Sequence, residues 1–241
     1  MDKYVLIVAG GKGLRMGGDL PKQFIPMRGK PLLMHTLEAF HRWDASARII
    51  LVLPEDHQPY WNMLCKEIGC KVPHAIVKGG DTRFFSVKNG LDWLLAERRR
   101  KGEEDSGLSL VAVHDGVRPF VSPEVVEACF DKAAVTGAVI PVVPMIDSLR
   151  ETDEKGSHPV DRSRYMAVQT PQVFLLELLT KAYEQPYSSL FTDDASVVEA
   201  MGHAIDTVPG DRENIKITTP FDLLIAVSYT HLRAHETLMN L

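Results

Sequence analysis

The stretch from Tyr4 to Gln23, YVLIVAGGKGLRMGGDLPKQ, decides how the chain folds. It begins with the apolar run Tyr4 to Val8, which is short, rich in β-branched residues and ended by glycine. Such a run is typical of a strand buried on both faces of a parallel sheet. The glycines that follow permit positive φ and expose backbone N–H groups at the carboxyl end of the strand. The sequence therefore predicts a central strand followed by a ligand-binding loop.

Two cations follow this loop, Arg15 and Lys22, and Pro21 stiffens the approach to Lys22. Backbone amides and fixed cations after a first strand suit a polyphosphate. The loop is not a dinucleotide fingerprint, because the third glycine of G-x-G-x-x-G is missing, and the Gly-Lys-Ser/Thr of a Walker A loop is also missing. A surface turn with solvated charges stays open as an alternative.

Composition limits the class of protein. The chain has 241 residues, 45% of them hydrophobic and 24% charged, which is an ordinary globular balance. The net charge of -5 argues against a broadly basic nucleic-acid-binding surface, so any anion site must be local. The three cysteines, Cys65, Cys70 and Cys129, have neither C-x-x-C nor metal-ligand spacing, which indicates reduced thiols that pack as small residues.

Nothing in the sequence indicates a membrane. The N-terminus lacks the basic and apolar regions of a signal peptide. No apolar run approaches the roughly 18 residues of a membrane span. We therefore expect a cytoplasmic protein with neither a membrane nor a nucleic acid among its partners.

The order of the elements predicts the fold class. Helical spacing over 31–40, 56–69, from 83 and from 123 alternates with buried strands at 48–53, 72–77 and 110–113. This β-α alternation predicts an α/β fold with a mostly parallel sheet flanked by helices. The helices that open near residues 82, 122 and 192 have caps among Asp81, Thr82, Ser122, Thr192 and Asp193.

Two other segments depart from this alternation. The strand at 138–144 contains Pro141 and Pro144, so we expect it to lie at an edge of the sheet or to leave the sheet. The polar stretch 145–168 predicts a protruding β-arm, which needs a partner surface because an isolated hairpin is marginal in water. The charge run 97–107 predicts a solvated helix end and loop.

Further candidate ligand groups follow two later strands. Asp81, Arg83 and Ser86 fall at a predicted helix N-terminus, where an anion site and simple capping are equally good interpretations. Asp115 ends the strand at 110–113, in the place where α/β sheets put ligand and metal groups. Its carboxylate suits Mg²⁺ held against phosphates.

Six motifs together give the chain a family resemblance. They are AGGKGLRMGGDLPKQF, GGDTRFFSV, HDGVRPFV, VQTPQVF, FTDDASVVE and ENIKITTP, in this order. The chain resembles the 2-C-methyl-D-erythritol 4-phosphate cytidylyltransferases of non-mevalonate isoprenoid precursor biosynthesis. The resemblance implies a Rossmann-like nucleotidyltransferase fold, CTP and a polyol phosphate as substrates, Mg²⁺ or another divalent cation, and a homodimer formed through the arm.

The resemblance also implies roles for individual residues. The catalytic cations would be Arg15, Lys22 and Lys216. The nucleotide side would comprise Ala9, Gly10, Gly11, Gly13, Asp81, Ser86, Asp115 and Arg118, with Asp115 also the metal ligand. The methylerythritol phosphate side would comprise Ser148, Arg162, Thr170 and Thr192, with Ser148 and Arg162 reaching over from the partner.

Some positions and the C-terminal segment depart from the family pattern, and two alternative functions stay open. Gly116 and Val117 stand where the family often has two alanines, and Ser148 stands where threonine is common. The resemblance covers about 3–226, so we expect one domain over 1–226 and an atypical tail, non-native or disordered, over 227–241. Ribitol-5-phosphate cytidylyltransferase, and a nucleotide-binding protein without turnover, are the alternative functions.

Overall fold

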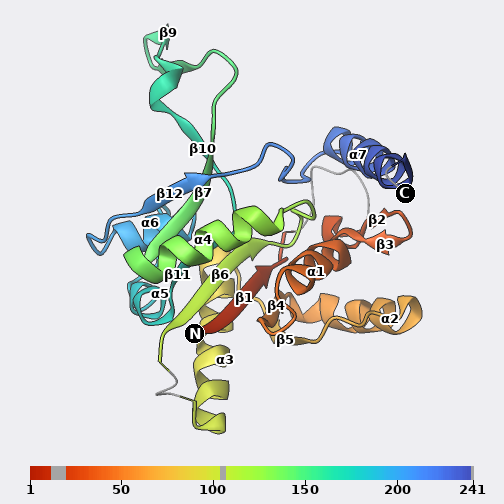
Figure 1. The fold of residues 1–241 in the computed structure, drawn as a ribbon. Coiled ribbons are helices and arrows are strands. Elements are labelled where there is room, and N and C mark those ends of the chain that lie inside the picture. Colours follow the sequence, from red (N-terminus) through yellow and green to blue (C-terminus); the bar gives the residue numbers. More distant parts are fainter. Residues whose placement is uncertain (12–19, 104–106, 240–241) are drawn as a thin grey trace.

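The computed structural model describes residues 1–11, 20–103 and 107–239 (Figure 1). An eight-stranded sheet forms the centre, in the order β10-β7-β11-β6-β1-β4-β5, with β12 also paired to β7. The strands are β1 (Asp2–Val8), β4 (Arg48–Leu53), β5 (His74–Lys78), β6 (Ser109–Asp115), β7 (Ala138–Pro144), β10 (Met166–Val168), β11 (Gln172–Leu175) and β12 (Asp206–Pro209). β1 pairs in parallel with β4 and β6, as the alternating sequence pattern predicts.

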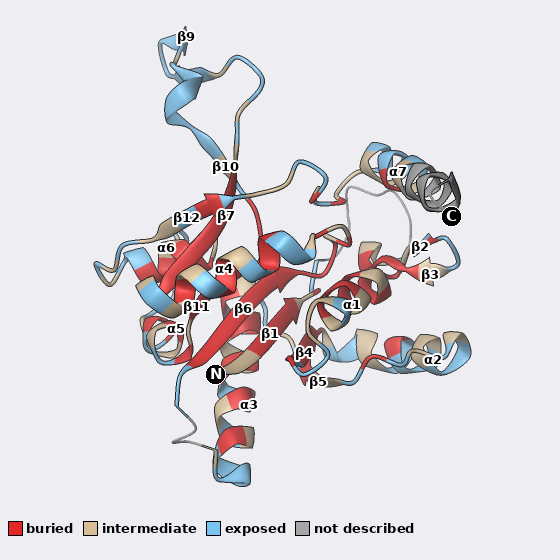
Figure 2. Cartoon of the chain, in the orientation of Figure 1, coloured by how far each residue is buried: buried red, intermediate tan, exposed pale blue. Residues whose placement is uncertain are grey.

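Helices cover both faces of the sheet (Figure 1). Side chains alternate across a strand, so Val5 and Ile7 pack on one face while Tyr4 and Leu6 pack on the other. The first face carries α1 (Leu32–Trp43), α2 (Gln58–Ile68) and α4 (Pro123–Thr136). The second carries α3 (Arg83–Lys101), α5 (Leu176–Ala182) and α6 (Asp194–Glu199). Buried residues therefore concentrate in the strands (Figure 2).

Predicted caps begin three of these helices. The Thr82 hydroxyl accepts a hydrogen bond from the Phe85 amide, and Ser122 does the same for Val125. Asp193 closes a capping box with Ser196. Three short 3-10 helices, η2 (Lys22–Phe24), η3 (Glu55–His57) and η4 (Arg162–Arg164), and the small ladder of β2 (Pro26–Met27) with β3 (Lys30–Pro31) complete the body and arm.

The prediction that the proline-containing strand lies at a sheet edge is wrong. β7 has β12 on one side, while β10 and β11 together line the other. Pro141 is tolerated because it lies opposite the break between β10 and β11. There its carbonyl accepts a hydrogen bond from Gln169 (2.9 Å), and no ladder amide is required of it.

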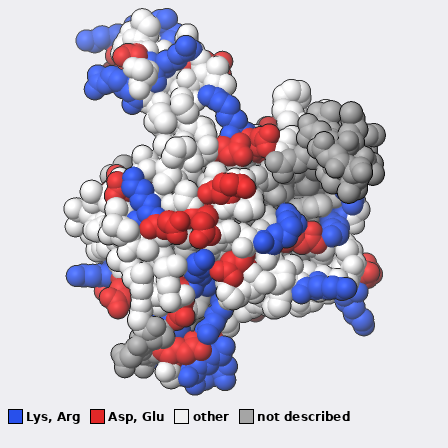
Figure 3. Space-filling view, viewed as in Figure 1, with Lys and Arg blue, Asp and Glu red and all other residues white. Residues whose placement is uncertain are grey.

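The predicted arm is present. β8 (Arg150–Asp153) and β9 (Gly156–Pro159) form an antiparallel hairpin, and every residue of both strands is exposed. The hairpin and η4 stand away from the body (Figures 1 and 2). The Lys and Arg side chains of the arm are prominent in Figure 3. The arm therefore has no apolar core of its own.

The interpretation of 97–107 as a solvated charge run is wrong for Arg98. This side chain is only 7% exposed, and its guanidinium donates to the Tyr4 hydroxyl (2.6 Å), to Ser109 Oγ (2.9 Å) and to Asp2 (3.2 Å). Arg98 therefore holds the end of α3 to the beginning of β1 and β6. The sequence of a charge run does not show which of its cations faces the core.

The tail does not separate from the body at residue 226. Helix α7 (Pro220–Met239) runs through that boundary. Val227 packs against the buried cluster around Ile217 and Ala226, and the Tyr229 ring lies 5.1 Å from that of Phe120. The packed unit thus extends at least to Tyr229. Of the helices described, none combines the length and apolar character that a bilayer crossing requires.

Candidate active site

The carboxyl ends of the central strands are joined by backbone hydrogen bonds. The Ala9 amide, just after β1, donates to the Val52 carbonyl of β4 (3.0 Å). The Gly116 amide, just after β6, donates to the Val8 carbonyl (2.9 Å). These bonds bring the glycine loop and Asp115 to one edge of the sheet, as expected for parallel strands.

A cavity of about 230 Å³ opens at this edge. Nine of the residues predicted from sequence line it: Ala9, Gly10, Gly11, Lys22, Asp81, Arg83, Ser86, Asp115 and Lys216. They come from segments that lie far apart in the chain. The remaining lining residues are Val8, Gln23, Gly80, Thr82 and Val117.

Asp115 is the electrostatic centre of the cavity. Its Oδ2 atom lies 3.0 Å from Lys216 Nζ and 3.1 Å from Arg118 Nε. Burial alone would raise the pKa of this carboxyl group, but the charges of Lys216, Arg83 and Arg118 outweigh burial and hold the pKa well below its usual range. Asp115 is therefore an anion at any pH near neutrality.

Two glycines let the backbone approach its neighbours. A Cβ atom on Gly11 would lie 3.0 Å from Lys22 Cε, so the loop and the lysine are in close contact. A Cβ atom on Gly80 would lie 2.5 Å from Phe85 Cβ, which no relaxed side chain allows. The lack of a side chain at these positions lets Lys22 and Phe85 pack directly against the backbone of the two glycine segments.

Ser86 has the capping role that its segment predicts. Its hydroxyl donates to the Thr82 carbonyl (2.9 Å) and accepts from the Gly80 amide (3.1 Å), which fixes the helix start. It also lines the cavity. Arg83, on the same turn, makes two bonds of 2.8 and 2.6 Å to Asp194, which is fully buried.

Thr170 lies behind Asp115 and does not line the cavity. Its side-chain oxygen accepts a hydrogen bond from the Asp115 amide (3.1 Å) and lies 3.1 Å from His114 Nδ1. The ring of His114 is fully buried, and burial lowers its pKa to about 4, so the imidazole is neutral. In this conformation Thr170 holds the end of β6 in place.

The other predicted substrate residues are not brought to the cavity within this subunit. Ser148, Arg162 and Thr192 are exposed. Arg162 bonds back to the Ile146 carbonyl of its own arm. Arg15 and Gly13 lie outside the described residues.

Gln23 is a cavity residue that the sequence interpretation missed. It is fully buried, and its amide lies 3.2 Å from His57 Nδ1. Its Oε1 atom has no hydrogen-bond partner among the described residues. Its place directly after Lys22 is the signal that would have found it.

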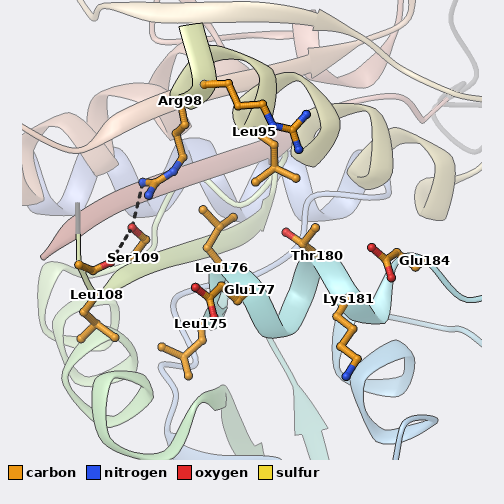
Figure 4. Close-up of a pocket in the computed structure, with 12 residues that line it drawn as sticks. Leu95, Arg98, Leu108, Ser109, Leu175, Leu176, Glu177, Thr180, Lys181 and Glu184 are labelled. Carbon is orange, nitrogen blue, oxygen red and sulfur yellow. Dashed lines mark hydrogen bonds between the residues drawn. The ribbon is translucent and has the colours of Figure 1, made fainter. Parts of the chain in front are cut away.

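A larger cavity of about 880 Å³ lies at the opposite end of β6, between α3 and α5 (Figure 4). Leucines form much of its wall, and Arg98 reaches Ser109 at one side. It contains neither the glycine loops nor Asp115. The residues that the sequence predicts to bind substrate therefore line the smaller cavity and not this one.

Comparison with known proteins identifies the family. Residues 4–231 match the family model described as 2-C-methyl-D-erythritol 4-phosphate cytidylyltransferase. The chain belongs to this cytidylyltransferase family. The cytidylyltransferase of Bacteroides fragilis is 56% identical over 226 residues, which is 94% of this chain and 98% of the relative. That of Porphyromonas gingivalis is 52% identical and spans 93% of this chain and 96% of its own.

Solved cytidylyltransferase structures share the fold. The Thermus thermophilus enzyme has a TM-score of 0.71 and 31% identity, covering 96% of this chain and 100% of its own. The 4-diphosphocytidyl-2C-methyl-D-erythritol synthase of Anaerococcus prevotii has a TM-score of 0.76 and 28% identity, covering 95% of this chain and 96% of its own. The cytidylyltransferase match extends to residue 231, past the boundary expected at 226.

Proposed function

We propose that this chain transfers CMP from CTP to 2-C-methyl-D-erythritol 4-phosphate, which gives 4-CDP-2-C-methyl-D-erythritol and pyrophosphate. Family membership supports the reaction class. The observation that carries the proposal is the Asp115 carboxylate bound by Lys216 and Arg118 beside two glycine segments. A triphosphate needs this combination of backbone amides and fixed cations.

The reaction needs little covalent help from the protein. The phosphate oxygen of the acceptor is already an anion at neutral pH, and it attacks the α-phosphorus of CTP in line while pyrophosphate leaves. Because no proton has to be removed from this oxygen, no general base is required. The neutral, fully buried His114 fits this mechanism, since it neither faces the cavity nor titrates near neutrality.

The protein would contribute position and charge. Lys22 lies against the glycine loop, where it would contact the triphosphate. Lys216 lines the same cavity, paired with Asp115, where it would meet the charge that develops at the α-phosphate. Arg15 would add a further cation to the triphosphate.

A divalent cation fits the Asp115 side of the cavity. Oδ2 is taken by Lys216 and Arg118, while Oδ1 has no bonded partner among the described residues and is not sealed from solvent. Mg²⁺ usually binds one or two carboxylates together with phosphate oxygens, so a single carboxylate suffices. When bound, the ion would neutralise phosphate charge, and Asp115 would be the residue that holds it.

The acceptor side would be completed by a second copy of the chain. Ser148 and Arg162 are exposed on an arm that has no core of its own. In a two-fold dimer, each arm would lie over the cavity of the other subunit. Arg162 would then offer its planar fork to the acceptor phosphate.

The deciding experiment measures pyrophosphate release with each of the four NTPs and with two acceptors, methylerythritol phosphate and ribitol 5-phosphate. We expect turnover with CTP and methylerythritol phosphate. Higher turnover with ribitol 5-phosphate would transfer the assignment to the related enzyme. CTP binding without pyrophosphate release would indicate a binding protein. Loss of activity with a chelator, restored by Mg²⁺, would support the metal.

A further inference from the structure

Two thiols meet at the end of α2, outside the cytidylyltransferase site. The helix ends at Gly69, which has a left-handed φ of 73°. The Cys70 amide then turns back to donate to the Cys65 carbonyl (2.9 Å). In a helix end of this type, the side chains at these two positions commonly contact each other. Here both are cysteines, and both pack against the same buried apolar cluster.

The three cysteines of the chain differ in access to solvent. Cys65 and Cys70 are partly exposed. Cys129 is fully buried between α4 and the sheet, and burial raises its pKa to about 12. A small oxidant in solution therefore reaches the pair, while Cys129 provides an internal control.

The environments of the paired thiols are unequal. The neighbouring Cys65 thiol, together with the Val72 amide, lowers the pKa of Cys70 to about 6. The neighbouring Cys70 and burial both raise the pKa of Cys65. Because the thiolate is the reactive form of cysteine, Cys70 is the attacking group and Cys65 is the proton-bearing neighbour.

We propose that Cys65 and Cys70 are a peroxide-reactive dithiol that closes reversibly to a disulfide across the end of α2. In the first step, Cys70 sulfur attacks hydrogen peroxide, the O–O bond breaks, and sulfenic acid and one water form. In the second step, Cys65 sulfur displaces the hydroxyl group of that sulfenic acid, which leaves as a second water. The two thiols lose two electrons, and the peroxide gains them.

The dithiol lies on the segment that supports the predicted catalytic lysine. Trp61 of α2 is fully buried, stacks on Phe24 at 6.3 Å and donates a hydrogen bond to His74 (3.0 Å), just beyond Val72. Phe24 belongs to η2, the short helix that begins with Lys22. Neither cysteine lines the cavity, so serine variants are expected to keep basal activity.

The test treats the full-length protein with hydrogen peroxide, blocks remaining thiols with an alkylating agent and maps the products by mass spectrometry. We expect a Cys65–Cys70 linked peptide while Cys129 is still alkylated, and loss of the link on treatment with a dithiol reductant. Cys65→Ser should accumulate sulfenic acid on Cys70, trapped by dimedone. Cys70→Ser should react at least about tenfold more slowly, since its remaining accessible thiol is protonated.

Peptide mapping of the parent protein requires no variant. The proposal can therefore be contradicted even if a serine variant fails to fold. A peptide map in which Cys70 passes to sulfinic acid without forming the link would overturn it. Oxidation of Cys129 before the pair would do the same. Equal reaction rates of Cys70→Ser and the parent would remove Cys70 as the attacking thiol.

Discussion

At the scale of single residues, charge is organised around Asp115. Two cations contact one of its oxygens, and a third cation, Arg83, is held in place by the buried Asp194. Lys216 and Arg118 thus have fixed positions before any ligand arrives. A ligand phosphate would meet a preorganised field, which is the largest single source of catalytic stabilisation in many enzymes.

Lys216→Ala is expected to reduce kcat far more than it reduces stability. The lysine side chain is 41% exposed, so its removal leaves no cavity in the core. Loss of one charge-stabilising contact should cost about 3–4 kcal/mol in the transition state, which corresponds to at least about a hundredfold in rate. Turnover and the thermal midpoint are measured on the same preparation, with Lys216→Arg as the charge-keeping control. Unchanged turnover would exclude Lys216 from the mechanism.

Asp115 should contribute a pH-dependent part of stability. Its folded-state pKa lies below the unfolded value of about 3.9, so its ionised form stabilises the fold at every pH above that value. As the pH falls below about 4 toward the folded-state pKa, the contribution is lost. Urea unfolding of the parent and of Asp115→Asn should therefore differ most near neutrality, with the difference shrinking in acid. A difference that grows in acid would contradict the assigned direction.

Arg98→Met should destabilise the protein but leave kcat unchanged per folded molecule. The substitution keeps much of the apolar stem but removes the donors to Asp2, Tyr4 and Ser109. Breaking such a buried polar network by removing one partner costs about 3 kcal/mol. Urea denaturation measures the loss, with the exposed Arg100→Met as the matched control. Equal stability of the two variants would show that Arg98 is as dispensable as a surface arginine.

At the scale of elements, the strands and helices of the central sheet were predictable because each has a local signature. Examples are the apolar run Tyr4 to Val8, the caps at Thr82 and Ser122, and the aspartate at the end of β6. Each can be recognised from a few neighbouring residues. The edge position predicted for β7 failed for a physical reason. A proline shows that one backbone N–H donor is missing from the strand. The sequence does not show that the neighbouring strand is interrupted opposite Pro141.

The same limit applies to the site. The ion pair of Arg83 with Asp194 joins residues 111 positions apart, and no spacing rule indicates it. Thr170 was predicted from the family resemblance to bind substrate, whereas its hydroxyl in this conformation bonds to the Asp115 amide. The motifs locate many of the residues that line the cavity. The group that each side chain contacts depends on how distant segments pack, which the motifs do not show.

Truncation after Ala226 should lower the thermal midpoint. It removes Val227, which packs against the cluster around Ile217, and Tyr229, which contacts Phe120 and bonds to Glu213. A truncation after Tyr229 retains these contacts and serves as the control. Differential scanning calorimetry compares the two with the full chain. If the shorter protein melted at the same temperature as the longer, the packing of α7 on the body would contribute nothing.

At the scale of the whole molecule, the arm is the feature that a single subunit does not explain. If its residues act in the neighbouring site, two inactive variants should complement each other. Arg162→Ala and Lys22→Ala proteins are mixed under conditions that exchange subunits, and activity is followed. A mixed dimer carries one site with both residues intact and one with neither, so activity should partly return. No recovery despite exchange, proven by mass-tagged subunits, would place Arg162 in its own subunit's site or outside catalysis.

The exposed hairpin of β8 and β9 has a consequence for how the total catalytic rate, the output, responds to dilution of the protein. If each catalytic centre borrows a hairpin from another molecule, the working species disappears when the protein concentration falls below the dissociation constant of the pair. Output would then rise with the square of protein concentration in the dilute regime and linearly above it. A cell that halved its supply of this chain would lose more than half of its flux, so expression level itself would act as a threshold.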